Sequence, residues 1–176
     1  TLAQVPSSLD LGDRMVALDL QDAYFHPILQ AHRHYLQFTV GQEHFQFTVL
    51  SFGLTSAPLV FTKVMVVVAA HLQRSVFPYL DDWQLKAGSP QVVITHLQTT
   101  SNFLTSLGFT IKMPKSHLTL SQMLPFIGAI LDTVQFCTYP MEWRVQDFLA
   151  MILMFQPLSR ISVRMTLRLL GLTASY

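Results

Sequence analysis

The chain has 176 residues, of which 51% are hydrophobic and only 12% charged, and its formal net charge is +1 at pH 7. This length suits one domain. In an ordinary soluble domain about 25% of the residues are charged, so this chain has unusually few charged residues. We therefore expect apolar surface that partner domains normally cover. The longest apolar runs, 64–70 and 148–155, are far shorter than the ~20 residues of a membrane helix, which excludes a membrane-spanning segment.

A single cysteine, Cys137, excludes an internal disulfide framework, and the scattered histidines provide no Cys/His set for zinc. Residues 1–13 are polar and do not resemble a signal peptide. We therefore expect an intracellular protein of the cytoplasm or nucleus that is not secreted. The small net charge neither requires nor excludes a nucleic-acid partner, because a basic stripe can lie within a neutral total.

The predicted elements are short strands and helices separated by turn residues. Gly41 divides two runs of aromatic and β-branched residues into a hairpin, and Ser89-Pro90 is typical of a helix start. In chain order we expect a strand at 14–20, a hairpin of 35–40 and 44–49, a helix at 58–74, a hairpin of 76–80 and 83–85, a helix from Ser89-Pro90 to Gly108, strands at 109–112 and 126–131, and helices at 142–155 and 159–170. This order predicts an α+β fold, with helices packed on one face of a largely antiparallel sheet.

Two adjacent acids, Asp81 and Asp82, lie inside the apolar run FPYLDDWQL (77–85), where a carboxylate is costly to desolvate without a cation. We expect them at the tip of a hairpin, and Asp19 at the end of the first strand can meet them if the strands are neighbours. Converging carboxylates of this kind bind two Mg²⁺ ions for phosphoryl displacement. Asp81 should then face Asp19, with Asp82 pointing elsewhere in a secondary role. The alternative is that the pair forms only a turn, because turns favour Asp on backbone grounds.

Three motifs in order, LDLQDAYF (18–25), LSFGLTSAP (50–58) and YLDD (79–82), resemble the palm domain of a reverse transcriptase. The residues of these motifs are most similar to those of retrotransposon enzymes, particularly the enzymes of DIRS-type elements. FTKVM (61–65) and MPKSHLTLSQMLPFIGAILDT (113–133) continue the resemblance, which covers nearly the whole chain. It implies a palm-like antiparallel sheet and an RNA-directed DNA polymerase that adds a dNTP to the primer 3′-hydroxyl on an RNA or DNA template.

The resemblance also implies roles for individual residues. Asp19, Asp81 and Asp82 match the acids that bind Mg²⁺ (or Mn²⁺), and Lys115 matches a lysine that protonates the leaving pyrophosphate. Tyr24 matches the aromatic gate against a ribose 2′-hydroxyl, and 126–131 resembles the hairpin that holds the primer. The residues that match the nucleotide-binding segments are Asp22, Ala23, Phe52 and Gly53. From the residues alone, Tyr24 can instead be a core aromatic and Lys115 a solvated side chain.

Arg160, Arg164 and Arg168 recur every four residues, which places them on one helix face, where they can contact phosphates or simply form a solvated basic face. Only eighteen residues precede Asp19, so we expect truncated fingers. The expected division is a fingers remnant or linker at 1–13, the palm at 14–134, and a helical segment at 135–176 that leads toward the thumb and connection. Other domains of a polyprotein, namely fingers, thumb and ribonuclease H, are then the expected partners.

Three functions remain open from the sequence. The first is RNA-directed DNA polymerase activity. The second is a catalytically inactive or domesticated remnant that still binds nucleic acid, which the truncated fingers and low charge favour. The third is a two-carboxylate nuclease, in which the gate-like Tyr24 would have no purpose.

Overall fold

The computed structural model describes residues 9–25, 30–51, 53–72, 76–155 and 162–174. Phe52 and Arg160 therefore lie outside the described residues, and the predictions made for them stay untested.

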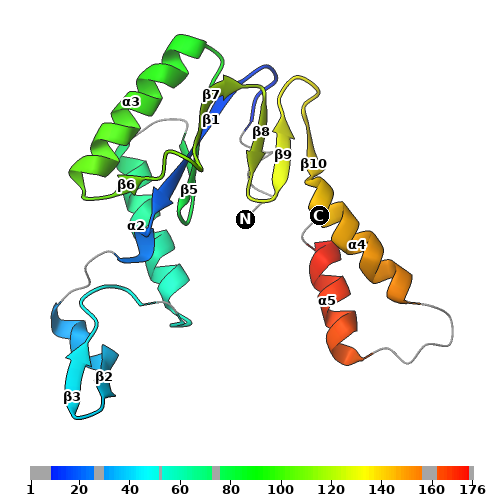
Figure 1. Cartoon of the computed structure of the whole chain (residues 1–176). Coiled ribbons are helices and arrows are strands. Elements are labelled where there is room, and N and C mark those ends of the chain that lie inside the picture. Colours follow the sequence, from blue (N-terminus) through cyan, green and yellow to red (C-terminus); the bar gives the residue numbers. More distant parts are fainter. Residues whose placement is uncertain (1–8, 26–29, 52, 73–75, 156–161, 175–176) are drawn as a thin grey trace.

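A five-stranded antiparallel sheet forms the centre of the fold. Its strands are β1 (Arg14–Gln21), β4 (Val76–Tyr79), β5 (Asp82–Ala87), β6 (Thr110–Ile111) and β7 (His117–Ser121). β1 is central: β5 pairs along one edge of it, and β6 and β7 share the other edge. Helices α2 (Ala57–Leu72) and α3 (Pro90–Ser106) pack against this sheet (Figure 1).

β1 is apolar along almost its whole length because both of its faces are buried. Val16, Leu18 and Leu20 pack with buried residues of α2 and α3 in the main core. Met15 and Ala17 point to the opposite face, since successive side chains of a strand alternate, and there they pack with β8 and β9 in a second core. Asp19 continues this second series, so its carboxylate lies on the face away from α2 and α3.

The remaining elements extend from this centre. β8 (Met123–Phe126), β9 (Ala129–Asp132) and β10 (Cys137–Pro140) form a three-stranded antiparallel sheet, β2 (Gln37–Val40) and β3 (Glu43–Gln46) form a separate hairpin, η1 (Ala23–Phe25) and η2 (Gln30–Leu36) are short 3₁₀ helices, and α4 (Glu142–Met154) contacts α5 (Val163–Ala174). The β2–β3 hairpin and the α4–α5 pair extend as two separate limbs from the same side of the body (Figure 1).

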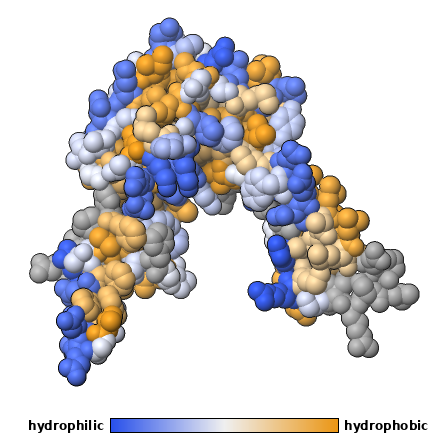
Figure 2. Space-filling view, viewed as in Figure 1, coloured by the Kyte–Doolittle hydropathy of each residue, from blue (hydrophilic) through white to orange (hydrophobic). Residues whose placement is uncertain are grey.

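Hydrophobic side chains reach the surface on the α4–α5 limb (Figure 2). The large exposed members on these two helices are Trp143, Leu149, Ile152, Leu153, Met154, Val163, Leu167 and Leu170. Some of the apolar residues that make the composition unusual are therefore exposed to solvent. None of the helices among the described residues is both long enough and apolar enough to cross a membrane.

The predicted α+β class is confirmed, and so is the α3 helix between Ser89 and Gly108. Gly108 has a φ of 88°, a conformation that glycine adopts without steric cost. The strand predicted at 126–131 is wrong, because Ile127 and Gly128 form a turn between β8 and β9. β7 and β10 were not predicted.

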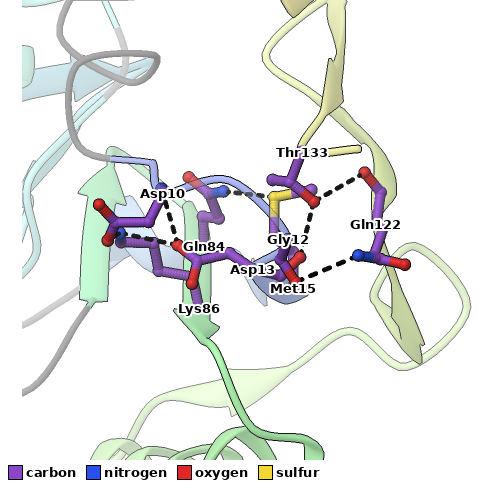
Figure 3. A network of polar contacts seen from close by, with 8 residues as sticks. All are labelled: Asp10, Gly12, Asp13, Met15, Gln84, Lys86, Gln122 and Thr133. Carbon is purple, nitrogen blue, oxygen red and sulfur yellow. Dashed lines mark hydrogen bonds and ion pairs between the residues drawn. The ribbon is translucent and has the colours of Figure 1, made fainter. Parts of the chain in front are cut away.

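Polar contacts tie the start of β1 to β5 of its own sheet and to the residues that flank β8 and β9 of the three-stranded sheet (Figure 3). The Lys86 ammonium lies 2.9 Å from the carboxylates of both Asp10 and Asp13. The Thr133 hydroxyl donates to the Asp13 carbonyl oxygen at 2.7 Å, and the Gln122 side-chain amide donates to the Gly12 carbonyl oxygen at 3.1 Å. These bonds fix the strand that carries Asp19 at its opposite end.

Lys86→Met is expected to destabilise the fold by about 3 kcal/mol, because it leaves a buried carboxylate without its cation. The Asp13 side chain is only 5% exposed, whereas that of Asp10 is 83% exposed. Asp10→Asn is the matched control, and it should cost no more than about 1 kcal/mol. Urea unfolding of the chain measures both, and equal losses would contradict a buried Lys86–Asp13 pair.

Candidate active site

The structure brings Asp19 and Asp82 directly opposite each other on neighbouring strands. The β1–β5 register pairs Asp19 with Asp82 and Leu18 with Trp83. Directly opposed residues of an antiparallel pair project on the same face. The two carboxylates therefore share the sheet face that lies away from α2 and α3, while Trp83 is fully buried in the main core.

The acidic hairpin differs from its prediction by one residue. The turn between β4 and β5 consists of Leu80 and Asp81, and Asp82 is the first residue of β5, paired with Tyr79. Asp82 therefore faces Asp19, and the expectation that it points elsewhere is wrong. Asp81 lies at the turn, where its carbonyl oxygen accepts a hydrogen bond from the Leu20 N–H at 2.9 Å. Leu80 has a φ of 54°, a conformation that costs a non-glycine residue free energy.

Electrostatic repulsion accompanies this arrangement of acids. Burial, followed by the charges of Asp81 and Asp19, raises the pKa of Asp82 from 3.8 to about 6, and Lys115 opposes the shift. Burial also raises the pKa of Asp19, with Asp81 adding to the shift and the two lysines, Lys115 and Lys112, opposing it. The three carboxylates repel one another, and a bound cation would offset this repulsion.

Lys115 reaches the acids from a turn between β6 and β7. The Lys115 N–H donates to the Lys112 carbonyl oxygen at 3.1 Å, which closes the turn. Lys115 faces both Asp19 and Asp82 closely enough to lower their pKa values. Lys115 therefore lies beside the acids and lines the same cleft, while its proton-donor role stays a prediction.

Tyr24 lies beside the acidic turn, in η1 directly after β1. Its ring stacks on Phe61 of α2, with centroids 4.7 Å apart and the ring planes 23° from parallel. Burial raises the pKa of the Tyr24 hydroxyl, and the Asp81 and Tyr79 charges add to the shift. The half-buried Tyr24 therefore has one ring face against the core and lies near the acids, while its role as a gate stays a prediction.

The other predicted nucleotide-binding residues fall into two places. Asp22 is exposed with a φ of 48°, and Ala23 is buried, so both lie in the tight turn that follows β1. Gly53 is exposed with a φ of 89°, and it lies just before α2. Arg164 and Arg168 lie one turn apart on α5 and are exposed, as the spacing predicts.

A small cleft of about 130 Å³ opens beside the acids. It is lined by Ala17, Leu18, Asp19, Asp82, Lys115, His117, Pro125, Phe126, Ile127 and Met141. One wall is thus the tip of the β8–β9 hairpin, where Ile127 has a φ of 50° and Gly128 a φ of 76°. This hairpin, which resembles the primer-holding segment, lines with apolar side chains the same cleft that Asp19 and Asp82 line.

The donor set suits Mg²⁺ that is shared with a substrate. Among the described residues, no group of three or more His, Cys, Asp or Glu side chains is arranged so that it could hold a metal ion by itself. Mg²⁺ usually takes only one or two carboxylates and completes its shell with water and substrate phosphates. Asp19 and Asp82, with Asp81 beside them, fit that requirement.

The sequence profile of the family described as "Reverse transcriptase (RNA-dependent DNA polymerase)" matches residues 7–170. The chain belongs to the reverse transcriptase family.

This reverse transcriptase domain is similar to proteins of viruses. It is 29% identical over 143 residues to the Gag-Pro-Pol polyprotein of bovine leukemia virus (isolate Australian), a match that covers 74% of the chain and 10% of the polyprotein. The solved foamy viral protease-reverse transcriptase with double-stranded DNA superposes with a TM-score of 0.74 at 18% identity, covering 98% of this chain and 35% of that one. The same viral protein with an RNA/DNA hybrid gives a TM-score of 0.72 at 18% identity, covering 90% and 20% of the two chains.

These similarities establish the family and the fold of the chain. The identities to the solved structures are low, so those structures show the fold alone. The domain also spans only a tenth of the curated polyprotein and about a third or less of the solved chains.

The sequence reasoning missed several residues at this reverse transcriptase site. Ser116 accepts a hydrogen bond from the backbone N–H of Asp19, and Pro125 and Met141 line the cleft. Gly128 inside an apolar run was a usable signal, since a glycine in a strand pattern often marks a turn. Ser116 gave no signal, because its partner is 97 residues away in the chain.

Proposed function

We propose that the chain is the catalytic part of an RNA-directed DNA polymerase that transfers a nucleotide from a dNTP to a primer 3′-hydroxyl. The observation that carries this proposal is the register that pairs Asp19 with Asp82, with Asp81 at the adjacent turn. Asp19, Asp82 and Asp81 would hold the metal ions, Mg²⁺ or Mn²⁺. When bound, these ions would stabilise charge on the attacking and leaving oxygens of the displacement.

The chain's own residues supply the rest of the site. Lys115 donates a proton to the departing pyrophosphate. Tyr24, held against Phe61, occupies the space that a ribose 2′-hydroxyl would need. Backbone amides around Asp22 and Ala23 face the triphosphate, and the segment of Phe52 and Gly53 shapes the nucleotide pocket.

Nucleic-acid contacts come from the β8–β9 hairpin, which lines the cleft, and from α5 on a separate limb. The β8–β9 hairpin supports the primer end, and Arg164 and Arg168 of α5, with Arg160, contact phosphates of an RNA or DNA template–primer duplex. The foamy viral relatives were solved with double-stranded DNA and with an RNA/DNA hybrid, which supports this class of partner.

The wider context is also a proposal. The amino-acid sequence of the motifs favours a retrotransposon polyprotein of the DIRS type, which would act in the cytoplasm or nucleus. Residues 1–13 are a fingers remnant or linker, 14–134 the palm, and 135–176 the segment toward the thumb. Fingers, thumb and ribonuclease H on the same polyprotein are the expected protein partners.

Primer extension on an RNA template tests the function. The chain should incorporate a dNTP in a Mg²⁺-dependent reaction, and Asp81→Asn should lower the rate at least about 100-fold because it removes a metal-binding carboxylate. Asp147→Asn, on the exposed surface of α4, is the control that keeps the same change of charge. Salt-sensitive binding of duplex without incorporation would instead support an inactive binding remnant, and cleavage of the template without nucleotides would support a nuclease.

Tyr24→Val is expected to weaken sugar selection. Removing the ring opens space for a 2′-hydroxyl, so preference for dNTP over rNTP should fall about 100-fold. Tyr24→Phe keeps the ring on Phe61 and should retain the preference. Single-nucleotide incorporation with matched dNTP and rNTP measures both variants, and an unchanged ratio in Tyr24→Val would contradict the gate.

A further inference from the structure

The strand pairing along the edge of β1 that β6 and β7 share is interrupted at Asp19. β6 pairs with Leu20 and Gln21, and β7 pairs with Met15 and Ala17. Between them the Lys112 N–H donates to the Asp19 carbonyl oxygen at 2.8 Å, as in a regular ladder. The Asp19 N–H, however, bonds to no strand carbonyl; it donates to the Ser116 hydroxyl oxygen at 3.0 Å.

The Ser116 hydroxyl is inserted where a direct backbone bond would otherwise form. It donates in turn to the Lys112 carbonyl oxygen at 3.0 Å, the atom that would accept from Asp19 in an uninterrupted ladder. The same carbonyl oxygen accepts from the N–H groups of Lys115 and Ser116 at 3.1 Å each. The Ser116 hydroxyl thus gives the Asp19 N–H a hydrogen-bond acceptor at the point where the chain turns away from the sheet.

This turn places Lys115 over the acidic face. Lys115 lies next to Ser116 in the chain, and its ammonium acts on both Asp19 and Asp82. A change at the hydroxyl would therefore move the acid and the lysine relative to each other, although Ser116 itself does not line the cleft. Small displacements of catalytic groups of about 1 Å can lower a rate about 100-fold.

We propose that Ser116 is a positioning residue whose hydroxyl sets the spacing between Asp19 and the Lys115 turn. This inference rests on the proposed polymerase function, because the spacing matters only if both groups act on one substrate. A structural role alone is the competing explanation, in which the hydroxyl closes the turn and nothing more.

The test compares Ser116→Ala with Ser116→Thr, which keeps the hydroxyl, in the whole chain. Ser106→Ala is the matched control: that hydroxyl donates to the Phe103 carbonyl oxygen at 2.7 Å at the end of α3. Hydrogen exchange should be faster at Asp19 in Ser116→Ala only. Single-nucleotide incorporation should show kcat lowered about 10- to 100-fold with KM changed less than about threefold, and Ser116→Thr should restore most of the rate.

A second readout does not depend on turnover. Binding of Mn²⁺ in the presence of a dNTP, followed by electron paramagnetic resonance, should weaken several-fold in Ser116→Ala and stay unchanged in Ser106→Ala. If exchange at Asp19 is unaltered, or if kcat and Mn²⁺ affinity both match the unmodified chain, the inference is overturned. If the unmodified chain incorporates nothing but Ser116→Ala still weakens Mn²⁺ binding, the proposed function fails; the role of Ser116 is then limited to positioning Asp19 for a metal ion, and the proposed spacing to Lys115 falls with the function.

Discussion

Replacing Asp82 with asparagine is expected to abolish nucleotide incorporation while making the metal-free protein more stable at pH 7. The rate should fall by at least about 10³-fold, because the variant loses one of the two facing carboxylates that would hold a metal ion. The stability gain has a separate cause. Burial and the charges of Asp81 and Asp19 raise the pKa of Asp82 from 3.8 to about 6, so its ionised form is destabilised in the folded state.

The direction of the pH dependence follows from that shift. Well below pH 3.8 Asp82 is protonated in both the folded and the unfolded chain, so it costs the fold nothing. As the pH rises from about 4 to about 6, the unfolded chain ionises first and the free energy of unfolding falls. One pKa unit corresponds to about 1.4 kcal/mol, but the side chain is only half-buried and solvent screens it, so we expect a loss of about 1–2 kcal/mol.

Urea unfolding in EDTA at pH 4 and pH 7 measures this effect beside primer extension. Asp82→Asn should match the unmodified chain at pH 4 and exceed it by about 1–2 kcal/mol at pH 7. Asp147→Asn, the exposed control on α4, should change neither quantity. An Asp82→Asn variant that is less stable at pH 7 would show that the acids do not repel one another.

Lys115→Met is expected to give the second large loss of activity. A general acid contributes about 10²- to 10⁴-fold to a rate, so incorporation should fall at least about 100-fold. The loss should be in kcat, because the primer and template contacts are elsewhere. The pKa of Asp82 should also rise further above about 6, since Lys115 opposes the present shift.

Lys112→Met provides the matched control from the same turn. Lys112 also lowers the pKa of Asp19, but its effect is the smallest of those that act on that group. We expect a rate within about tenfold of the unmodified chain. Single-turnover incorporation separates the two variants, and equal losses would mean that the lysines act only through their charge.

Local signals in the sequence predicted much of the fold. α3 begins at Ser89-Pro90 and ends at Gly108, and α2 and α4 follow their expected ranges within about two residues. The strand of Asp19 was also predicted, from a short apolar run with an acid near its end, and β1 covers it. These elements depend on interactions between near neighbours in the chain.

The arrangement of the acids depended on one residue of register. The sequence favoured Asp81 and Asp82 as the turn, because Asp is common in turns, whereas the structure uses Leu80 and Asp81. A shift of one residue in a strand moves every side chain to the other face, so it decided which acid meets Asp19. The positive φ values of Leu80 and Ile127 gave no sequence signal, since Leu and Ile rarely adopt them.

Anomalous diffraction from Mn²⁺, in crystals of the chain with an RNA/DNA primer–template and a non-hydrolysable dNTP analogue, tests most directly whether Asp19 and Asp82 share a metal ion. We predict a manganese peak about 2.0–2.6 Å from oxygens of both carboxylates. A peak coordinated by neither carboxylate, with the nucleotide bound, would contradict the metal site and the polymerase function that depends on it.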